Sequence, residues 1–242
     1  MAVMDYIREQ ASKRKPILVV LLDPEKPIDL SLMCEQIKQS EVDLVFVGGS
    51  TGRKIEDFVL YLKKHVPQKI VLFPGNIHQF CAQADALLFL SVLNATDWQM
   101  LIGQQIRAAR AIQQSQIETI AMGYILIDGG KKSAVEQTTH CVPYSQQDVD
   151  LIVDTAIAGE LLGMQLIYLE AGSGAMTPVG TEIIRQVKAH LHIPLIVGGG
   201  IRSEQTMQEI FNAGADIVVI GNHFEHYPQQ VTSFATYKNS IK

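Results

Sequence analysis

Three glycine-bearing segments in the last third of the chain carry the residues best suited to hold an anion. In the run Tyr168-Leu169-Glu170-Ala171-Gly172-Ser173-Gly174, an apolar strand leads directly into a Gly-Ser-Gly turn. The other segments are Gly198-Gly199-Gly200 and Gly221-Asn222, each directly after a short aliphatic run. Glycine lets main-chain N–H groups approach an anion closely, and Ser173 adds a hydroxyl donor. One such segment is typical of a tight turn, but the set of three predicts a phosphate site.

Two acidic residues follow apolar runs at positions where chemistry is expected. Glu170 ends the run above, and Asp23 opens the segment Asp23-Pro24-Glu25-Lys26 after the first apolar run. Ser50 follows the second apolar run, and a carboxylate and a hydroxyl on neighbouring strands could share one Mg²⁺ with water and substrate phosphates. Taken singly, however, an aspartate before a proline more often forms a turn, and a serine there more often caps a helix.

The composition is that of an ordinary globular protein. The chain has 242 residues, of which 47% are hydrophobic and 19% charged. This length fits one barrel better than two average domains, so residues 1–242 are expected to form a single domain. The net charge of −5, with no basic patch, disfavours nucleic acid as a partner. Three widely spaced cysteines without a CxxC pair predict neither a zinc site nor a disulfide framework, and indicate a cytoplasmic protein.

Short apolar runs alternate with amphipathic stretches along the whole chain. The runs are continuous rather than alternating, which is typical of parallel strands covered on both faces. We expect strands at 17–22, 44–47, 70–73, 86–90, 118–127, 166–170, 195–197 and 217–220, and helices that include 30–40, 149–162, 181–190 and 203–212. This pattern predicts an α/β protein with a (β/α)8 TIM barrel, although an open doubly wound sheet would show the same periodicity. The segment 74–85 is short, so the third helix is expected to be abbreviated or absent, and the long segment 128–147 is expected to cover the site.

These motifs, in this order, resemble the geranylgeranylglyceryl phosphate synthase family, which includes the heptaprenylglyceryl phosphate synthases. The resemblance covers nearly the whole chain, and its most diagnostic part is the run from Tyr168 to Gly174. It implies an Mg²⁺-dependent prenyltransferase of lipid biosynthesis. In this family the C3 hydroxyl of sn-glycerol 1-phosphate attacks C1 of a polyprenyl diphosphate, and diphosphate leaves.

The resemblance also implies roles for particular residues. Tyr168 and Glu170 would contact the glycerol hydroxyls, with Glu170 a plausible general base. Asp23 and Ser50 would hold Mg²⁺ against the diphosphate, and Lys26 would add positive charge because Leu21 stands where some members carry a basic residue. The glycerol phosphate would be bound by the run that contains Leu169, Ala171, Gly172, Ser173 and Gly174, and by Gly198, Gly199, Gly200, Gly221 and Asn222.

The lipid substrate adds further expectations. Candidates for an apolar groove are Phe73, Phe89, Leu90, Trp98 and Leu101, which are also the residue types of an ordinary barrel core. The long segment 128–147, with its paired lysines, resembles the archaeal-type and related bacterial members of the family, which favours a geranylgeranyl donor. Transient proximity to a membrane and a homo-oligomeric state are expected as well. Two alternatives stay open: another phosphate-binding barrel of the isomerase or synthase type, and a barrel that binds phosphate without catalysis.

Overall fold

Eight parallel strands close into one barrel. The computed structural model describes residues 1–49, 55–76, 78–133, 136 and 141–241. Each strand pairs in parallel with the next, and the last pairs with the first, so the barrel has no open edge. This confirms the expected TIM barrel over the open sheet. The strands are β1 (Ile17–Leu22), β2 (Leu44–Val47), β3 (Lys69–Leu72), β4 (Ala86–Val92), β5 (Glu118–Leu126), β6 (Leu166–Glu170), β7 (Leu195–Gly198) and β8 (Ile217–Ile220).

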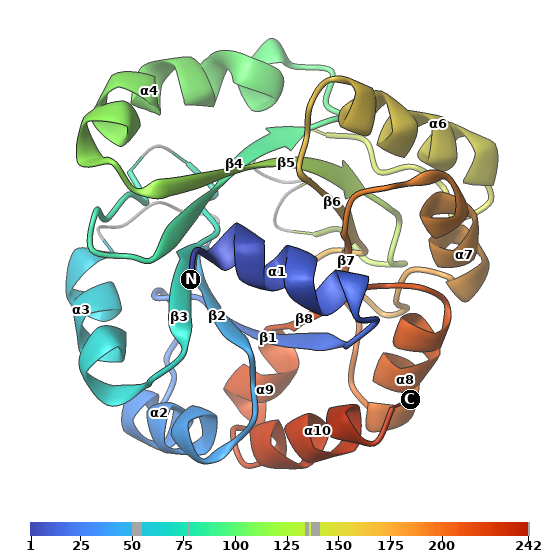
Figure 1. Ribbon diagram of the computed structural model, residues 1–242. Helices are drawn as coiled ribbons and strands as arrows, with labels where there is room; N and C mark the ends of the chain where they lie inside the picture. The colour runs from blue at the N-terminus through green and yellow to red at the C-terminus, as the bar shows by residue number, and fades with distance from the viewer. Residues whose placement is uncertain (50–54, 77, 134–135, 137–140, 242) are drawn as a thin grey trace.

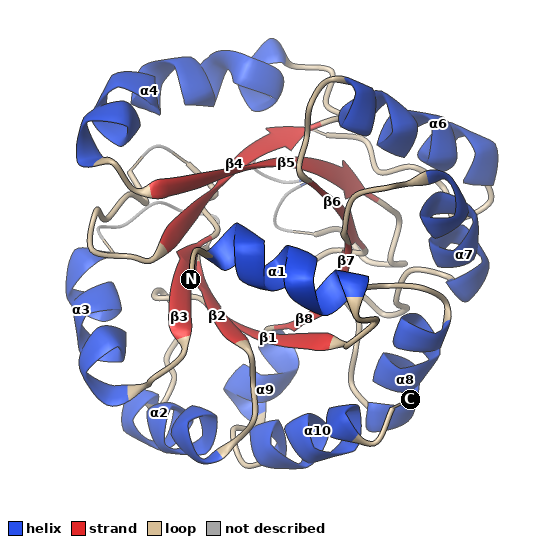
Figure 2. Ribbon diagram, in the orientation of Figure 1, coloured by secondary structure: helices blue, strands red, loops and turns tan. Residues whose placement is uncertain are grey.

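Helices form a ring around this barrel (Figure 2). Asp29 and Ser203 cap two of them, accepting hydrogen bonds from the main-chain N–H groups of Leu32 and Thr206. A short π-helical turn, η1 (Gln99–Gly103), leads into α4. The helices are α1 (Val3–Ser12), α2 (Leu30–Gln39), α3 (Glu56–His65), α4 (Gln104–Ser115), α6 (Val149–Leu161), α7 (Thr181–His190), α8 (Glu204–Asn212), α9 (Asn222–His226) and α10 (Gln230–Asn239).

The core has two layers, because successive strand residues point to opposite faces. In β1, Ile17 and Val19 face the barrel interior, whereas Leu18, Val20 and Leu22 pack in the layer beneath the helices. Both faces are therefore apolar, which explains the continuous hydrophobic runs in the sequence.

Helix α1 closes one end of the barrel (Figure 1). Val3, Met4 and Ile7 pack in the interior layer. The Glu118 carboxylate, at the start of β5, accepts the main-chain N–H groups of Val3 at 2.6 Å and Met4 at 2.7 Å. A carboxylate at the first turn of a helix satisfies its unpaired N–H donors and complements its dipole. With this end closed, a ligand has access at the carboxyl ends of the strands.

The connection from β3 to β4 contains no helix among its described residues, 73–76 and 78–85, as the short segment predicted. The predicted covering segment lies partly outside the described residues, at 134–135 and 137–140. Its later part returns beside β5, where Tyr144 N–H donates to the Leu126 carbonyl at 3.0 Å. Within the described chain, no helix is both long and apolar enough to cross a membrane.

Candidate active site

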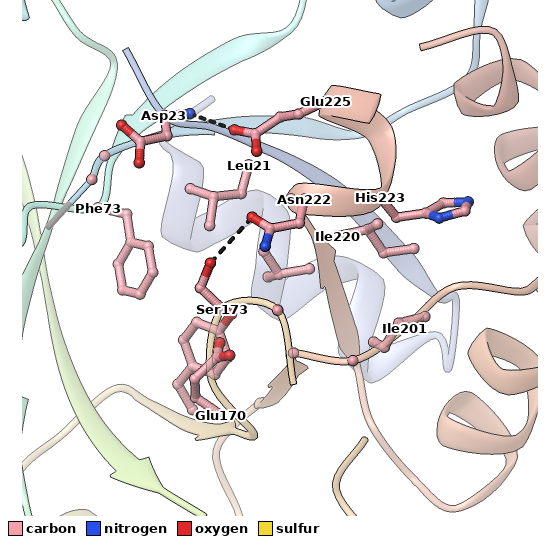
Figure 3. Close-up of a pocket in the computed structure, with 18 of the residues that line it drawn as sticks. Leu21, Asp23, Phe73, Glu170, Ser173, Ile201, Ile220, Asn222, His223 and Glu225 are labelled. Carbon is pink, nitrogen blue, oxygen red and sulfur yellow. Dashed lines mark hydrogen bonds between the residues drawn. The ribbon is translucent and has the colours of Figure 1, made fainter. Parts of the chain in front are cut away.

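A cavity of about 190 Å³ lies at the open end of the barrel (Figure 3) and is lined by residues in, or directly after, each of the eight strands. Asp23 and Phe73 lie on one side of it, and Ile201, Ile220 and Asn222 lie on the other. The cavity therefore brings together the first and last thirds of the chain, as expected for loops at the carboxyl end of a barrel.

The loops after β6, β7 and β8, which were predicted to bind an anion, line this cavity together; we call them the cradle. The cavity is lined by Ser173, Gly174, Gly199, Gly200, Gly221 and Asn222. The Ser173 hydroxyl donates to Asn222 Oδ1 at 3.1 Å, so two of the loops are joined directly. Arg202, which follows β7, is hydrogen-bonded to the loop after β6. Its Nη2 donates to the Ala175 carbonyl at 2.5 Å and its Nη1 to the Met176 carbonyl at 3.2 Å.

Gly198 and Gly199 are required by the side chains that pass beside them. A Cβ at position 198 would lie 2.1 Å from the Tyr168 hydroxyl, and one at position 199 would lie 2.5 Å from Glu170 Oε1. Gly199 also has φ +85°, a backbone conformation that favours glycine. These residues therefore shape the cradle through the absence of side chains.

Glu170 and Tyr168 form a buried, hydrogen-bonded pair in the cavity, which we call the buried acidic pair after its carboxyl group. Tyr168 is 1% exposed and Glu170 is 7% exposed. The Tyr168 hydroxyl and, at 2.7 Å, the Gly172 main-chain N–H donate to the Glu170 carboxylate. Burial raises the pKa of Glu170 above that of an exposed glutamate, although both of these hydrogen bonds act in the opposite direction. A carboxylate of raised pKa beside an anion cradle can accept a proton from a bound hydroxyl.

An aromatic cluster surrounds this pair. The Tyr168 ring stacks on Phe73 at a centroid distance of 5.4 Å and meets the edge of Tyr124 at 5.5 Å. Burial and the nearby Glu170 raise the pKa of Tyr124 well above its usual range, so this phenol stays neutral. Sequence reasoning did not single out Tyr124, but its position directly opposite Tyr168 in the strand register marks it.

The other predicted binding residues of the first run do not line the cavity with their side chains. Leu169 and Ala171 pack in the layer beneath the helices, and the Ala171 N–H donates to the Gly198 carbonyl at 3.0 Å. The Gly172 N–H is used by Glu170. These three residues therefore belong to the framework behind Tyr168 and Glu170.

Asp23 is the acidic group on the opposite side of the cavity. Its Oδ1 accepts the Glu25 N–H at 3.0 Å, and a Cβ on Gly49 would lie 2.3 Å from the same oxygen. Asp23 therefore faces the end of β2, as the Mg²⁺ prediction requires. Ser50, the second predicted metal ligand, lies outside the described residues.

Lys26, which was predicted to add positive charge, joins the loop after β1 to the residues after β8. Its Nζ donates to Asn222 Oδ1 and forms an ion pair with Glu225 Oε2 at 2.6 Å. Lys26 thus stands at the phosphate side of the cavity. Sequence reasoning missed Glu225, which lies 199 residues from Lys26 in the chain and meets it only because the barrel closes.

A second, apolar cavity of about 70 Å³ adjoins the first beside the connection from β3 to β4, whose described residues form no helix. Pro74, Leu90 and Val92 line both cavities. Phe89 also lines the second cavity and Phe73 the first, as the groove prediction requires. The remaining groove candidates, Trp98 and Leu101, line neither, and Trp98 is 56% exposed.

A divalent metal fits Asp23 only with help from a substrate. Among the described residues, no group of three or more His, Cys, Asp or Glu side chains could hold a metal ion. Mg²⁺, however, is commonly bound by one or two carboxylates while water and substrate phosphates complete its shell. The Asp23 carboxylate, at the edge of an open cavity, suits that mode of binding.

Fold and site together define a (β/α)8 barrel that has a glycine-lined cavity at its last three strands and an apolar cavity beside its third. The chain belongs to the PcrB family, whose model matches residues 5–237. It is 41% identical over 228 residues to the geranylgeranylglyceryl phosphate synthase of Zunongwangia profunda, covering 93% of this chain and 97% of the relative. It is 42% identical to that of Flavobacterium johnsoniae, covering 93% of this chain and 94% of the relative.

A solved structure of similar fold carries a ligand. The (S)-3-O-geranylgeranylglyceryl phosphate synthase of Thermoplasma acidophilum, in complex with its substrate sn-glycerol-1-phosphate, matches with a TM-score of 0.92 and 30% sequence identity. The match covers 100% of this chain and 99% of the other. The sequence-based resemblance to this family is therefore confirmed.

Proposed function

We propose that this chain is a geranylgeranylglyceryl phosphate synthase that joins sn-glycerol 1-phosphate to geranylgeranyl diphosphate. The observation that carries this proposal is one cavity with an anion cradle on one side, Asp23 on the other, and an apolar extension between β3 and β4. A phosphorylated polar acceptor and a long apolar donor need these three features together. The same acceptor is bound in the related structure from Thermoplasma acidophilum.

The acceptor would lie between the cradle and the buried acidic pair. Its phosphate is bound by the glycine loops, Ser173 and Asn222, and its hydroxyls contact Tyr168 and Glu170. The C3 oxygen forms a bond to C1 of the donor as the bond from C1 to the diphosphate oxygen breaks. The hydroxyl proton passes to the Glu170 carboxylate, and the Tyr168 hydroxyl orients that carboxylate by donating to it.

The donor diphosphate would lie on the Asp23 side of the cavity. Asp23, with Ser50, is the proposed ligand of an Mg²⁺ ion, which when bound neutralises charge on the departing diphosphate. The prenyl chain extends past Leu90 into the second cavity. Phe80, Phe89 and Met100 line that cavity and supply its apolar wall.

An assay with purified protein, Mg²⁺, sn-glycerol 1-phosphate and radiolabelled prenyl diphosphates of increasing length tests this function. We expect a butanol-extractable product that depends on Mg²⁺ and is formed fastest from the geranylgeranyl donor. Absence of product with every donor, alongside tight binding of glycerol phosphate, would leave a phosphate-binding barrel and reject the prenyl transfer.

A pair of neighbouring alanines on α4 tests the proposed path of the chain. Ala108 lines the second cavity, whereas Ala109 is exposed on the same helix. Ala108→Phe should lower the rate with the geranylgeranyl donor about tenfold by filling the cavity, whereas Ala109→Phe should leave it unchanged. Equal rates for the two variants would place the prenyl chain elsewhere.

We also propose that the chain works as a cytoplasmic homo-oligomer that approaches a membrane through its lipid donor. The support is an apolar stripe in which Trp98, Ile102 and Ile106 are 56%, 49% and 61% exposed at successive four-residue steps. Exposed apolar side chains in one patch mark an interaction surface. Light scattering should give a mass above that of one chain, and Ile106→Asp should reduce it. A monomeric wild-type protein would contradict this assembly.

A further inference from the structure

The Glu225 carboxylate joins the two sides of the active-site cavity. Its Oε1 accepts the main-chain N–H of Asp23 at 3.0 Å (Figure 3). Its Oε2 pairs with Lys26 Nζ at 2.6 Å. The Glu225 side chain is 3% exposed. Both oxygens of this buried carboxylate are thus engaged, one by the proposed metal ligand and one by a lysine at the phosphate cradle.

Lys26, held by Glu225, in turn fixes the orientation of the Asn222 side chain. A lysine ammonium donates hydrogen bonds and accepts none, so the Asn222 atom that faces it must be the amide oxygen. The Ser173 hydroxyl donates to the same oxygen. With Oδ1 fixed by two donors, the amide nitrogen Nδ2 turns toward Gly174, where it lies 3.3 Å from the position that a Cβ would take. Asn222 therefore presents a donor to the cradle, as an anionic ligand requires.

The element that carries Glu225 is anchored in the core. The neighbouring Phe224 is fully buried and meets the edge of Phe234 on α10 at a centroid distance of 5.2 Å. The Glu225 N–H donates to the Gly221 carbonyl at 3.1 Å. A fixed backbone lets this carboxylate set the positions of its partners rather than follow them.

We propose that Glu225 is a positioning residue that serves both substrates of the reaction. Through Oε2 and Lys26 it orients the Asn222 amide for the glycerol phosphate. Through Oε1 it fixes the main chain of Asp23 for the metal-bound diphosphate. This inference rests on the proposed function, and it assigns Lys26 to the acceptor side rather than to the donor diphosphate.

Two substitutions separate the two arms of this proposal: the acceptor arm, through Oε2 and Lys26, and the donor arm, through Oε1 and Asp23. In Glu225→Gln the amide oxygen can still accept the Asp23 N–H, but the amide nitrogen cannot accept from Lys26. We expect a rise of about tenfold in the KM for sn-glycerol 1-phosphate, the size typical of lost supporting contacts, with donor KM and Mg²⁺ requirement unchanged. Glu225→Ala removes both acceptors, so the Mg²⁺ concentration for half-maximal rate should rise as well.

Lys26→Met should reproduce the effect of Glu225→Gln on the acceptor KM. The double variant should be no worse than either single variant, because the two residues act through one contact. A rise in the donor KM rather than the acceptor KM in Lys26→Met would overturn the proposal and return Lys26 to the diphosphate. An acceptor KM within twofold of wild type in Glu225→Gln would overturn it too.

Asp216 provides the control for a purely structural role. Its Oδ2 accepts the Leu195 N–H at 2.8 Å and pairs with Lys188 Nζ at 2.6 Å, but it lies at the closed end of the barrel, before β8. Asp216→Asn should lower the melting temperature without changing either KM. If Glu225→Gln behaves like Asp216→Asn, the positioning role is rejected.

Titration calorimetry with sn-glycerol 1-phosphate alone separates this proposal from the proposed function. Glu225→Gln and Lys26→Met should each weaken binding about tenfold without donor or metal present. If the two variants weaken binding as expected while the wild-type protein forms no product, the prenyl transfer is rejected and the acceptor arm of the proposal stands. Unchanged binding in both variants would reject the positioning role even if wild-type enzyme is active.

Discussion

The two sides of the cavity handle negative charge in different ways. The phosphate side is built of glycine loops with the Asn222 amide as a donor, and its geometry is fixed by the hydrogen bonds that Ser173 and Lys26 donate to Asn222. The donor side presents the Asp23 carboxylate next to the apolar Phe73 and Leu90. An anion can bind directly to the first side, but a diphosphate beside Asp23 needs a cation between the two. The fold thus completes one anion site and leaves the other to be completed by metal.

Glu170 is proposed to accept the proton when the acceptor on one side reacts with the donor on the other. Its loss therefore has the largest expected effect. Glu170→Gln should lower kcat roughly a thousandfold, within the range for a general base. The amide oxygen can still accept the Gly172 N–H, and the cradle is untouched. Binding of sn-glycerol 1-phosphate, measured by calorimetry, should therefore persist.

The exposed Glu182→Gln on α7 is the control for this loss and should retain full activity. Substantial turnover by Glu170→Gln would mean that another group accepts the proton.

Asp23 tests the donor side alone. Asp23→Asn should lower activity about a hundredfold, because it removes the charge that holds the metal against the leaving diphosphate, while affinity for sn-glycerol 1-phosphate stays within twofold. Activity measured across a range of Mg²⁺ concentrations should show a raised requirement.

Asp29→Asn is the matched control for Asp23, since Asp29 lies in the same loop and asparagine also caps helices well. If Asp23→Asn weakened glycerol phosphate binding instead, the division of the cavity into two sides would be wrong.

Two glycines with similar backbone conformations test the phosphate side. Gly199 and Gly163 have φ +85° and +91°, but only Gly199 is crowded, whereas nothing lies within 4 Å of a Cβ at Gly163. Backbone strain should cost each alanine variant about 1 kcal/mol of stability, and Gly199→Ala should lose roughly 1–3 kcal/mol more because its methyl is crowded. Only Gly199→Ala should weaken glycerol phosphate binding, by at least about tenfold, because the new methyl displaces Glu170 and the loop. Denaturation and calorimetry on both proteins check this.

Most of the barrel could be predicted from the sequence, because its buried strands leave a local pattern. Four strands begin and end where predicted, at 17–22, 44–47, 166–170 and 217–220, because continuous apolar runs bounded by polar residues identify buried parallel strands. The third begins and ends one residue earlier than expected. Phe73 still donates to the Val47 carbonyl, but Pro74 has no N–H with which to continue the ladder.

The glycine cradle could be predicted because each loop carries its own local signal. The strand alternation would also have separated Leu169 and Ala171, which face the helices, from Tyr168 and Glu170, which face the barrel interior. Glu225 could not be found in this way. Its partners Asp23 and Lys26 lie 202 and 199 residues away, and nothing in the neighbouring sequence distinguishes this buried glutamate from a surface one.

The raised pKa of Glu170 gives the smallest expected effect, a pH dependence in which activity and stability change in opposite directions. Catalysis needs the ionised carboxylate, so kcat/KM should fall as the pH drops through a pKa above 4.5, the ordinary value. A carboxyl whose pKa is higher in the folded state than in the unfolded state destabilises the fold when ionised, and this cost disappears as the pH falls through the folded-state pKa. Glu170→Gln should therefore have a higher melting temperature than wild type at neutral pH and lose that advantage in acid.

Tyr168→Phe tests the same pKa from the other side of the hydrogen bond. It removes a hydrogen bond that lowers the Glu170 pKa, so the acid limb, the fall of kcat/KM at low pH, should move to higher pH. An acid limb at or below pH 4.5, or one that Tyr168→Phe moves downward, would remove Glu170 from the role of base.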